Sequence, residues 1–386
     1  MEKAEKFTAW DVAKQIFELA EIGSQEIKSS KLLEDVLEAH GFKIQRGYMD
    51  IPTSFRAEMV KGKGEFSIAF LAEYDALPGI GHACGHNLIA AANVFAAIEA
   101  FKKITNGKII VLGTPDEEGS GKYSGSKILL ANKGAFNGID LVLGAHPGDR
   151  WDVGDIALAV QDLEVVFRGV AAHEAASPEK GKSALDGAIL TYTAVNMLRQ
   201  HVKRDKNVVI HGIIKEGGQA SNVTPERASL VYGIRSSDVE YEKELINKFK
   251  NIVYGCSIAT ETTYEIKEIG PLFLPTKINP TLSNFIRDKL LEKGVSCQPL
   301  EQSLKEMPSG STDFANVSQL VPALELGFKI ADAGTPWHSR ASLAAAGSES
   351  AKESLNIVIS VLSQTAYDYT VDKELRKRID EDFKRK

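Results

Sequence analysis

Apolar positions in the first 160 residues follow two patterns, one with helical spacing and one continuous. Helical spacing over residues 8–40 predicts helices with a break near Gly23. Continuous apolar runs predict buried strands, and the segments between them have helical spacing. The predicted strands are 67–74, 109–114 and 140–146, and the predicted helices are 88–101 and 124–133. This β-α-β alternation predicts a mainly parallel sheet with right-handed crossovers.

The pattern changes near residue 160, where residues 162–169 alternate like a half-exposed strand. The elements predicted after it are helix 183–201, strands 207–215 and 228–235, helix 239–254 and strand 260–268. This β-α-β-β-α-β order is the ferredoxin-like split unit. Three prolines then mark a return to the first domain, which helices 280–293 and 347–369 and a strand near 321–326 complete. We therefore predict an α/β protein with a larger domain at 1–160 and 275–386 and an inserted α+β domain at 161–274.

Composition excludes several classes of protein. A net charge of −6 over 386 residues argues against a nucleic-acid-binding surface. No apolar run approaches the roughly 20 residues that span a bilayer, and the charged residues 1–6 lack the apolar core of a signal peptide. The three cysteines show no disulfide spacing, which favours a reducing compartment. These features predict a soluble cytoplasmic protein without a nucleic-acid or membrane partner.

Residues 82–86 place two histidines and Cys84 within five positions. A thiolate and an imidazole two residues apart are borderline-soft ligands, which suit zinc and neighbouring transition metals. A buried cysteine beside surface histidines is an equally good interpretation of this motif alone.

Ligand-type residues also follow two of the predicted buried strands. Asp116, Glu117 and Glu118 come after the strand at 109–114, and His146 ends the strand at 140–146. An acidic loop and a structural histidine are the ordinary interpretations of each. Together with Cys84 they favour a metal site, because open α/β sheets place their sites at the carboxyl ends of strands.

Further polar side chains lie in predicted loops, where function is common. His173 follows the first strand of the inserted domain, Asn222 lies in a Gly-rich turn, Gly310 and Ser311 lie in a small polar loop, and His338 follows Trp337. Each alone is more often a turn residue or a surface histidine. The sequence has no H-E-x-x-H, G-x-S-x-G or G-x-G-x-x-G pattern, so serine-hydrolase and dinucleotide-binding functions have little support.

Taken together, these residues resemble the zinc-dependent peptidase and amidohydrolase family that includes glutamate carboxypeptidase and aminoacylase. The resemblance runs from about residue 10 to 370 and includes the insertion. The Cys-Gly-His segment resembles the amidohydrolase branch, where a bridging Cys replaces the Asp of other members. Most of that branch has Asp at the position of Asn87. The Asn resembles the subgroup that contains p-aminobenzoyl-glutamate hydrolase and β-alanyl-lysine dipeptidase.

The resemblance implies two divalent metal ions per subunit, zinc or manganese with cobalt as a further option. The implied ligands are Cys84, which would bridge the two ions, and His86, Glu118, His146 and His338. Glu117 would remain unliganded as the general base and acid, because a carboxylate on a metal loses basicity. Asp75 would orient a ligand. The His that the family has two positions before it is Glu73 here, and His86 would supply that ligand.

The resemblance also implies that the larger domain is catalytic and that the inserted domain is a lid that forms a homodimer. His173 would act in trans, stabilising the oxyanion in the partner's site. Asn222, Arg235, Gly310 and Ser311 would contact substrate. The expected function is hydrolysis of an amide bond in N-acyl or N-aroyl amino acids or short peptides, through a metal-bridging water.

Three alternatives remain open. One is a metallo-carboxypeptidase or dipeptidase. The second is an inactive binding protein on the same scaffold, which the presence of all five expected ligands and Glu117 disfavours. The third is a thiol enzyme with Cys84 as its nucleophile, which has no obvious partner cysteine.

Overall fold

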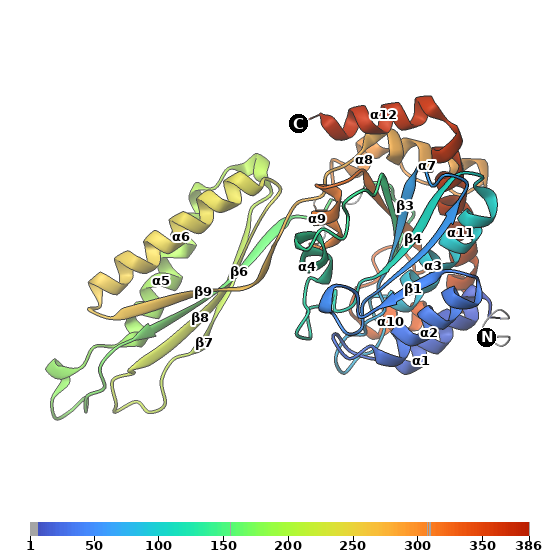
Figure 1. Cartoon of the computed structure of the whole chain (residues 1–386). Helices are drawn as coiled ribbons and strands as arrows, with labels where there is room; N and C mark the ends of the chain where they lie inside the picture. Colours follow the sequence, from blue (N-terminus) through green and yellow to red (C-terminus); the bar gives the residue numbers. More distant parts are fainter. Residues whose placement is uncertain (1–6, 155, 307, 309, 386) are drawn as a thin grey trace. The chain divides into compact units, whose positions relative to one another are not determined.

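The chain forms two compact units in the computed structural model, which describes residues 7–385 except 155, 307 and 309. Residues 1–6, which bear on the expected absence of a signal peptide, lie outside that range. Unit 1 consists of Met1–Ile156, Thr276–Glu306 and Thr312–Lys386, and unit 2 of Ala157–Pro275 and Met307–Ser311. The two units are described separately below (Figure 1).

Unit 1 is built on a mostly parallel sheet with the order β1-β2-β4-β3-β5-β10 in its described part. The strands are β1 (Lys43–Arg46), β2 (Phe55–Lys61), β3 (Ser67–Ala72), β4 (Gly107–Gly113), β5 (Leu141–Gly148) and β10 (Ala323–Lys329). Strands β4, β3, β5 and β10 run parallel, whereas β1 and β2 are antiparallel additions at one edge. All six residues of β3 are buried, as its unbroken apolar sequence predicts for a central strand covered on both faces.

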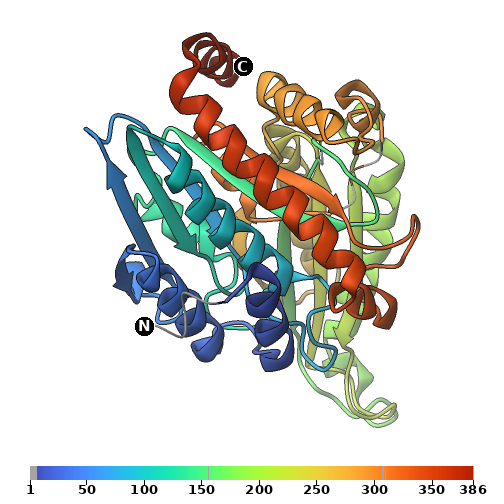
Figure 2. The ribbon, with the colours of Figure 1, turned by 90° about the vertical axis from the view of Figure 1, so that its right-hand side faces the viewer.

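Helices cover both faces of this sheet. One face packs on α1 (Ala9–Leu19), α2 (Ile27–Ala39), α3 (His86–Lys103), α7 (Pro280–Glu292) and α11 (Glu349–Val371). Helices α3 and α11 lie side by side across that face (Figure 2). The other face packs on α4 (Ser126–Asn132) and α9 (Phe314–Ser318). The remaining helices of the unit are α8 (Leu300–Ser303), α10 (Arg340–Ala346) and α12 (Lys373–Lys384).

Unit 2 is a four-stranded antiparallel sheet with two helices on one face (Figure 1). Its elements in chain order are β6 (Ala159–Arg168), α5 (Ala184–Leu198), β7 (Val209–Glu216), β8 (Arg227–Ser236), α6 (Val239–Ala259) and β9 (Thr263–Phe273). The sheet order β7-β8-β6-β9 is that of a ferredoxin-like unit. Every second residue of β6 from Leu163 to Phe167 is buried against α5 and α6, which explains the alternation in the sequence.

The fold class predicted from the sequence is therefore confirmed, with differences at element ends. Strands β1 and β2 were not predicted, because both mix charged and apolar residues and lie towards a sheet edge. Helix α6 was expected to end before Gly255 but continues to Ala259. A glycine inside a helix costs only about 1 kcal/mol, which packing on the sheet offsets. No helix in the described part of the chain has the length and apolar character needed to cross a membrane.

Candidate metal centre

Three adjacent parallel strands of unit 1 carry candidate ligands at their carboxyl ends. Glu73 and Asp75 follow β3, Glu117 and Glu118 follow β4, and His146 lies near the end of β5. Because β4, β3 and β5 are neighbours in the sheet, these side chains share one edge although they are up to 73 residues apart in the sequence.

Gly85 joins Cys84 to His86, the first residue of α3. Its φ of 83° is left-handed, and a Cβ at this position would lie 2.5 Å from Cγ of Pro147. Only glycine allows both this conformation and this close approach. The Cys-Gly-His motif is therefore a tight helix entry that directs the thiol and the imidazole toward the strand ends.

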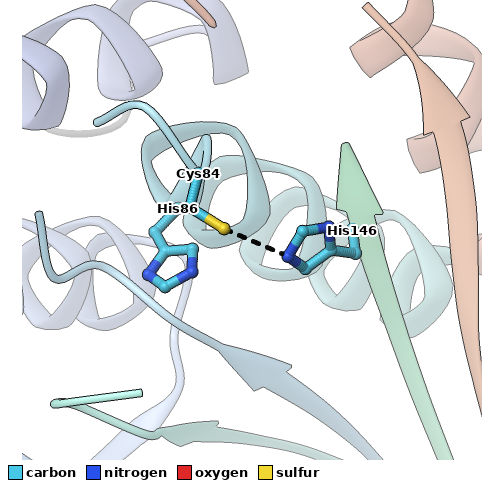
Figure 3. A group of neighbouring side chains, drawn as sticks. All are labelled: Cys84, His86 and His146. Carbon is cyan, nitrogen blue, oxygen red and sulfur yellow. Dashed lines mark hydrogen bonds between the residues drawn. The ribbon is translucent and has the colours of Figure 1, made fainter. Parts of the chain in front are cut away.

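Two ligand sets share Cys84. The first is Cys84, His86 and His146, and Sγ of Cys84 lies 3.5 Å from Nε2 of His146 (Figure 3). The second is Cys84, Glu118 and His338, with Nε2 of His338 3.5 Å from Oε1 of Glu118. In each set the ligand atoms lie within 4.8 Å of one another. The structure thus brings together all five residues that the resemblance implies as ligands. They form two sets, and the thiol of Cys84 belongs to both.

The residues present fit a pair of divalent ions. Nε2 of His86 and Oε1 of Glu118 are buried and have no hydrogen-bond partner among the described residues. A buried polar atom without a partner is costly, so both atoms favour a cation that is bound in addition to the protein groups. Thiol, imidazole and carboxylate are the donors that zinc and neighbouring transition metals accept.

Asp75 holds both sets in place. Its Oδ1 accepts a hydrogen bond from Nδ1 of His86 at 2.9 Å, and its Oδ2 accepts one from the backbone N–H of Glu118 at 3.0 Å. The first bond leaves Nε2 of His86 as the metal-facing nitrogen. Burial alone would lower the pKa of His86, but Asp75 and Cys84 outweigh it and raise that pKa well above its usual value. Asp75 thus has the contacts of a ligand-orienting residue.

Burial changes the acidity of two reactive groups at the site. Burial raises the pKa of Cys84 to about 12, and the nearby His86 only partly opposes it. A neutral thiol of this kind is a poor nucleophile, and a bound cation would be needed to form the thiolate. Burial and the neighbouring Glu73 raise the pKa of Glu117 to about 8, so this carboxyl can hold or release a proton near neutral pH.

Asp116, the first of the three consecutive acids, is not part of either ligand set. It has a left-handed φ of 60°, and its carboxylate accepts hydrogen bonds from the backbone N–H groups of Gly121 and Tyr123 and from the Ser24 hydroxyl. The repulsion expected from three adjacent carboxylates is therefore relieved partly by turning one of them into its own loop.

His82 has a structural position. Its Nε2 lies 3.0 Å from the carbonyl oxygen of Ile16, and burial lowers its pKa to about 4. This histidine is neutral at physiological pH and links α1 to the start of the motif.

A buried ionic network beside the site was not found from the sequence. Nζ of Lys127, on α4, contacts Oε1 of Glu73 at 2.8 Å and also bonds Asp313. All three side chains are at most 2% exposed. The sequence feature that points to this network is a lysine within the predicted apolar helix at 124–133. Its acidic partners lie 54 and 186 residues away, so sequence spacing does not reveal them.

The expected substrate residues of unit 2 form two separate groups. His173 pairs with Val223, next to Asn222, and accepts a hydrogen bond on Nδ1 from Ala175, which leaves Nε2 as the donor. Arg235 donates to the Ser311 hydroxyl, and Gly310 pairs with Ala157. The first group adjoins the start of β8 and the second its end. Eight residues of strand separate them by roughly 26 Å.

Comparison with known proteins places the chain in a family. Residues 69–365 match the model of Peptidase family M20/M25/M40. The chain is 36% identical to mouse Xaa-Arg dipeptidase over 87% of its length and 79% of that protein. It is 34% identical to human Xaa-Arg dipeptidase over 100% of its length and 90% of that protein. It is 32% identical to a p-aminobenzoyl-glutamate hydrolase chain of Escherichia coli, over 74% of this chain and 62% of that one.

Solved structures share the fold at low sequence identity. A dinuclear metal binding peptidase of the M20 family from Bacillus subtilis superposes with a TM-score of 0.65 at 19% identity, covering 92% of this chain and 97% of that one. An aminobenzoyl-glutamate utilization protein from Klebsiella pneumoniae gives 0.64 at 18% identity, covering 89% and 94%. With the family match and the shared-thiol ligand sets, these findings identify the chain as a member of peptidase family M20/M25/M40, a metal-binding hydrolase of amide bonds.

Proposed function

We propose that this protein is a binuclear metallohydrolase that cleaves dipeptides with a basic C-terminal residue, and N-acyl amino acids more slowly. The observation that carries the two-ion site is that Cys84 belongs to both ligand sets. The similarity to Xaa-Arg dipeptidases over most of the chain supports the dipeptide preference. The similarity to p-aminobenzoyl-glutamate hydrolase supports the second substrate class.

In this proposal Cys84, His86 and His146 would hold one ion, and Cys84, Glu118 and His338 would hold the other. When bound, the ions, zinc or manganese, would supply Lewis acidity toward the substrate carbonyl and the attacking water. Glu117 takes a proton from that water and returns it to the leaving amine, because it lies beside His86 but is in neither set that contains Cys84. Asp75 keeps Nε2 of His86 directed at the ion.

We further propose that unit 1 is the catalytic domain and unit 2 the lid, and that two subunits form a homodimer through unit 2. Strand β7 is an edge strand, and its Ile213 is 61% exposed. Helix α5 contacts β7 and exposes three apolar side chains, those of Ile189, Leu190 and Met197. An apolar helix face next to an unpaired strand edge is a typical site for association.

The separation of the two groups in unit 2 supports a trans role for His173. His173 and Asn222 lie at one end of β8, and Arg235 with Ser311 lies at the other, where the chain connects to unit 1. One substrate of dipeptide size does not span roughly 26 Å. If both groups contact the same substrate, they must come from different subunits.

The proposed location is the cytoplasm. The unpaired cysteines support a reducing compartment of this kind.

The experiment is a substrate screen with the metal-reconstituted protein. We expect Xaa-Arg and Xaa-Lys dipeptides to be cleaved faster than p-aminobenzoyl-glutamate or N-acetyl amino acids. Metal analysis should give two ions per chain, and Cys84→Ala should lose metal from both sets. A matched control is Cys256→Ala on α6, which should keep both ions. An unchanged metal content in Cys84→Ala would refute the shared ligand.

A further inference from the structure

Glu73 has one carboxylate oxygen that the proposed two-ion site does not use. Its Oε1 lies 2.8 Å from Nζ of Lys127, whereas its Oε2 is buried and has no hydrogen-bond partner among the described residues. The two sets that share Cys84 account for the unpartnered atoms of His86 and Glu118. They leave Oε2 of Glu73 with one contact in the part of the chain that the structure describes, the ion pair with Nε2 of His86 at 3.5 Å. That contact is lost when Nε2 binds an ion in the first set, and the loss is costly for a buried carboxylate oxygen.

The side chains around this oxygen are themselves metal-ligating groups. Oε2 of Glu73 lies 3.5 Å from Nε2 of His86, and Oε2 of Glu117 lies 3.8 Å from the same nitrogen. The ligand atoms of Glu73, His86 and Glu117 all lie within 4.8 Å of one another. They form a third ligand set, which contains His86 but not Cys84.

The local charge favours a cation there. The carboxyl groups of Glu73, Glu117 and Asp313 lie around two basic groups, the ammonium of Lys127 and the imidazole of His86. Lys127 contacts Asp313 and Oε1 of Glu73, whereas Oε2 of Glu73 faces the imidazole nitrogen of His86. A carboxylate excess in a buried site is what a bound divalent ion balances.

His86 cannot serve both the first and the third set at once. Its Nδ1 is bonded to Asp75, so the ring has a single nitrogen, Nε2, to offer. An imidazole nitrogen has one lone pair and binds one ion. An ion in the third set therefore removes His86 from the Cys84–His86–His146 set and occupies Glu117, the proposed general base.

We propose that Glu73, His86 and Glu117 form an alternative, non-productive position for a divalent cation, in competition with the Cys84–His86–His146 position. This inference rests on the proposed two-ion function, since it concerns where one of those ions goes. The competition is for one nitrogen, so the ratio of the two positions does not depend on metal concentration. It depends on which metal is bound.

Ligand chemistry predicts the direction of that dependence. The Cys84 set offers a thiolate and two imidazoles, which zinc prefers, whereas the Glu73 set offers two carboxylates and one imidazole, which suit manganese better. A larger share of manganese than of zinc should therefore occupy the Glu73 position, and the manganese form should be the less active for that reason.

The test is crystallographic and uses the full-length protein. Crystals loaded with Zn²⁺ or with Mn²⁺ alone are measured at the absorption edge of each metal, and the anomalous occupancy of each position is refined. We expect a peak between Glu73, His86 and Glu117 that is stronger with manganese and that is accompanied by a weaker peak at His146. This measurement requires no variant, so it does not depend on whether a mutant folds.

Variants give a second readout. Glu73→Gln should remove the peak and raise the ratio of manganese to zinc activity, in proportion to the share of manganese that occupied the Glu73 position in the native protein. The matched control Glu99→Gln, an exposed carboxylate on α3 paired with Lys102, should leave that ratio unchanged.

The outcomes separate this inference from the proposed function. Filled Cys84 sets with no peak at Glu73 for either metal would overturn the alternative position and leave the two-ion site intact. A peak at Glu73 with both Cys84 sets empty would support the position but overturn the proposed function. No metal at any of the three sets would overturn both.

Discussion

Glu117 and Glu118 are adjacent in the sequence but have different surroundings. Oε1 of Glu118 faces His338, and its backbone N–H is held by Asp75. Glu117 instead lies among Glu73, His86 and Lys127, and its pKa is raised to about 8 by burial and by Glu73. These contacts support the proposed assignment of Glu118 to the metal and of Glu117 to proton transfer.

Glu117→Gln tests the proton-transfer role. The amide keeps the size of the side chain but cannot accept and return a proton, so kcat should fall by about 10²–10⁴-fold. Both ions in the Cys84 sets should remain, since neither set includes Glu117. Metal analysis and steady-state kinetics on the same sample check this. Substantial remaining turnover with two ions bound would remove Glu117 from its role.

At the scale of elements, the ends of β3, β4 and β5 and the entry to α3 build the site. Three residues at or beside the site have a left-handed backbone: Gly85 at the helix entry, Asp116, which closes its own loop, and His338. Strained backbone of this kind is maintained by the surrounding packing. The geometry of the candidate site therefore depends on the packing around these three positions.

Helix α6 of unit 2 carries a buried acid with a consequence for stability. Glu242 is fully buried, and burial raises its pKa from 4.5 to about 8. Between those values the folded protein retains a proton that the unfolded chain releases. The contribution of Glu242 to the free energy of unfolding is therefore highest below pH 4.5. It falls as pH rises to 8, by about 1.4 kcal/mol per unit of pKa difference.

Glu242→Gln should remove this loss. Thermal unfolding is followed by circular dichroism from pH 5 to 9. The free energy of unfolding of the variant, relative to that of the native protein, should increase as pH rises, by a few kcal/mol at pH 9. The control Glu244→Gln changes an exposed acid on the same helix that pairs with Lys248, and it should show no such trend. Parallel curves for Glu242→Gln and the native protein would contradict the buried-acid explanation.

At the scale of the whole molecule, the candidate metal ligands lie in unit 1 and His173 lies in unit 2. A trans role for His173 predicts complementation between inactive subunits. His173→Ala and Glu117→Gln dimers should each be nearly inactive. After subunit exchange, each mixed dimer would contain one site with an intact Glu117 and an intact partner His173, so activity should return to about a quarter of the native value.

The control for this experiment mixes Glu117→Gln with the double variant Glu117→Gln/His173→Ala, where no intact site can form. If mixed dimers are demonstrated and activity stays at the level of this control, His173 does not act across the interface.

The sequence by itself determined the layers of the fold and the local motif. Periodicity of 2 or 3.6 residues reports which face of an element is buried, so β3, β4, β5 and the inserted β-α-β-β-α-β unit could be predicted. The Cys-Gly-His segment could be recognised because a helix entry with two ligands is local. Strands β1 and β2 escaped prediction because both mix charged with apolar residues and so give no strong apolar signal.

Only the tertiary structure decided which polar groups meet. Strand order places Glu73, Glu117 and His146 side by side, and that order is not written in the spacing between them. The same holds for Lys127 with Asp313, for the turn of Asp116 away from the ligand sets, and for the distance between His173 and Arg235. Burial and hydrogen bonding depend on partners far along the chain, so the chemistry of each carboxylate is fixed by packing and not by its neighbours in sequence.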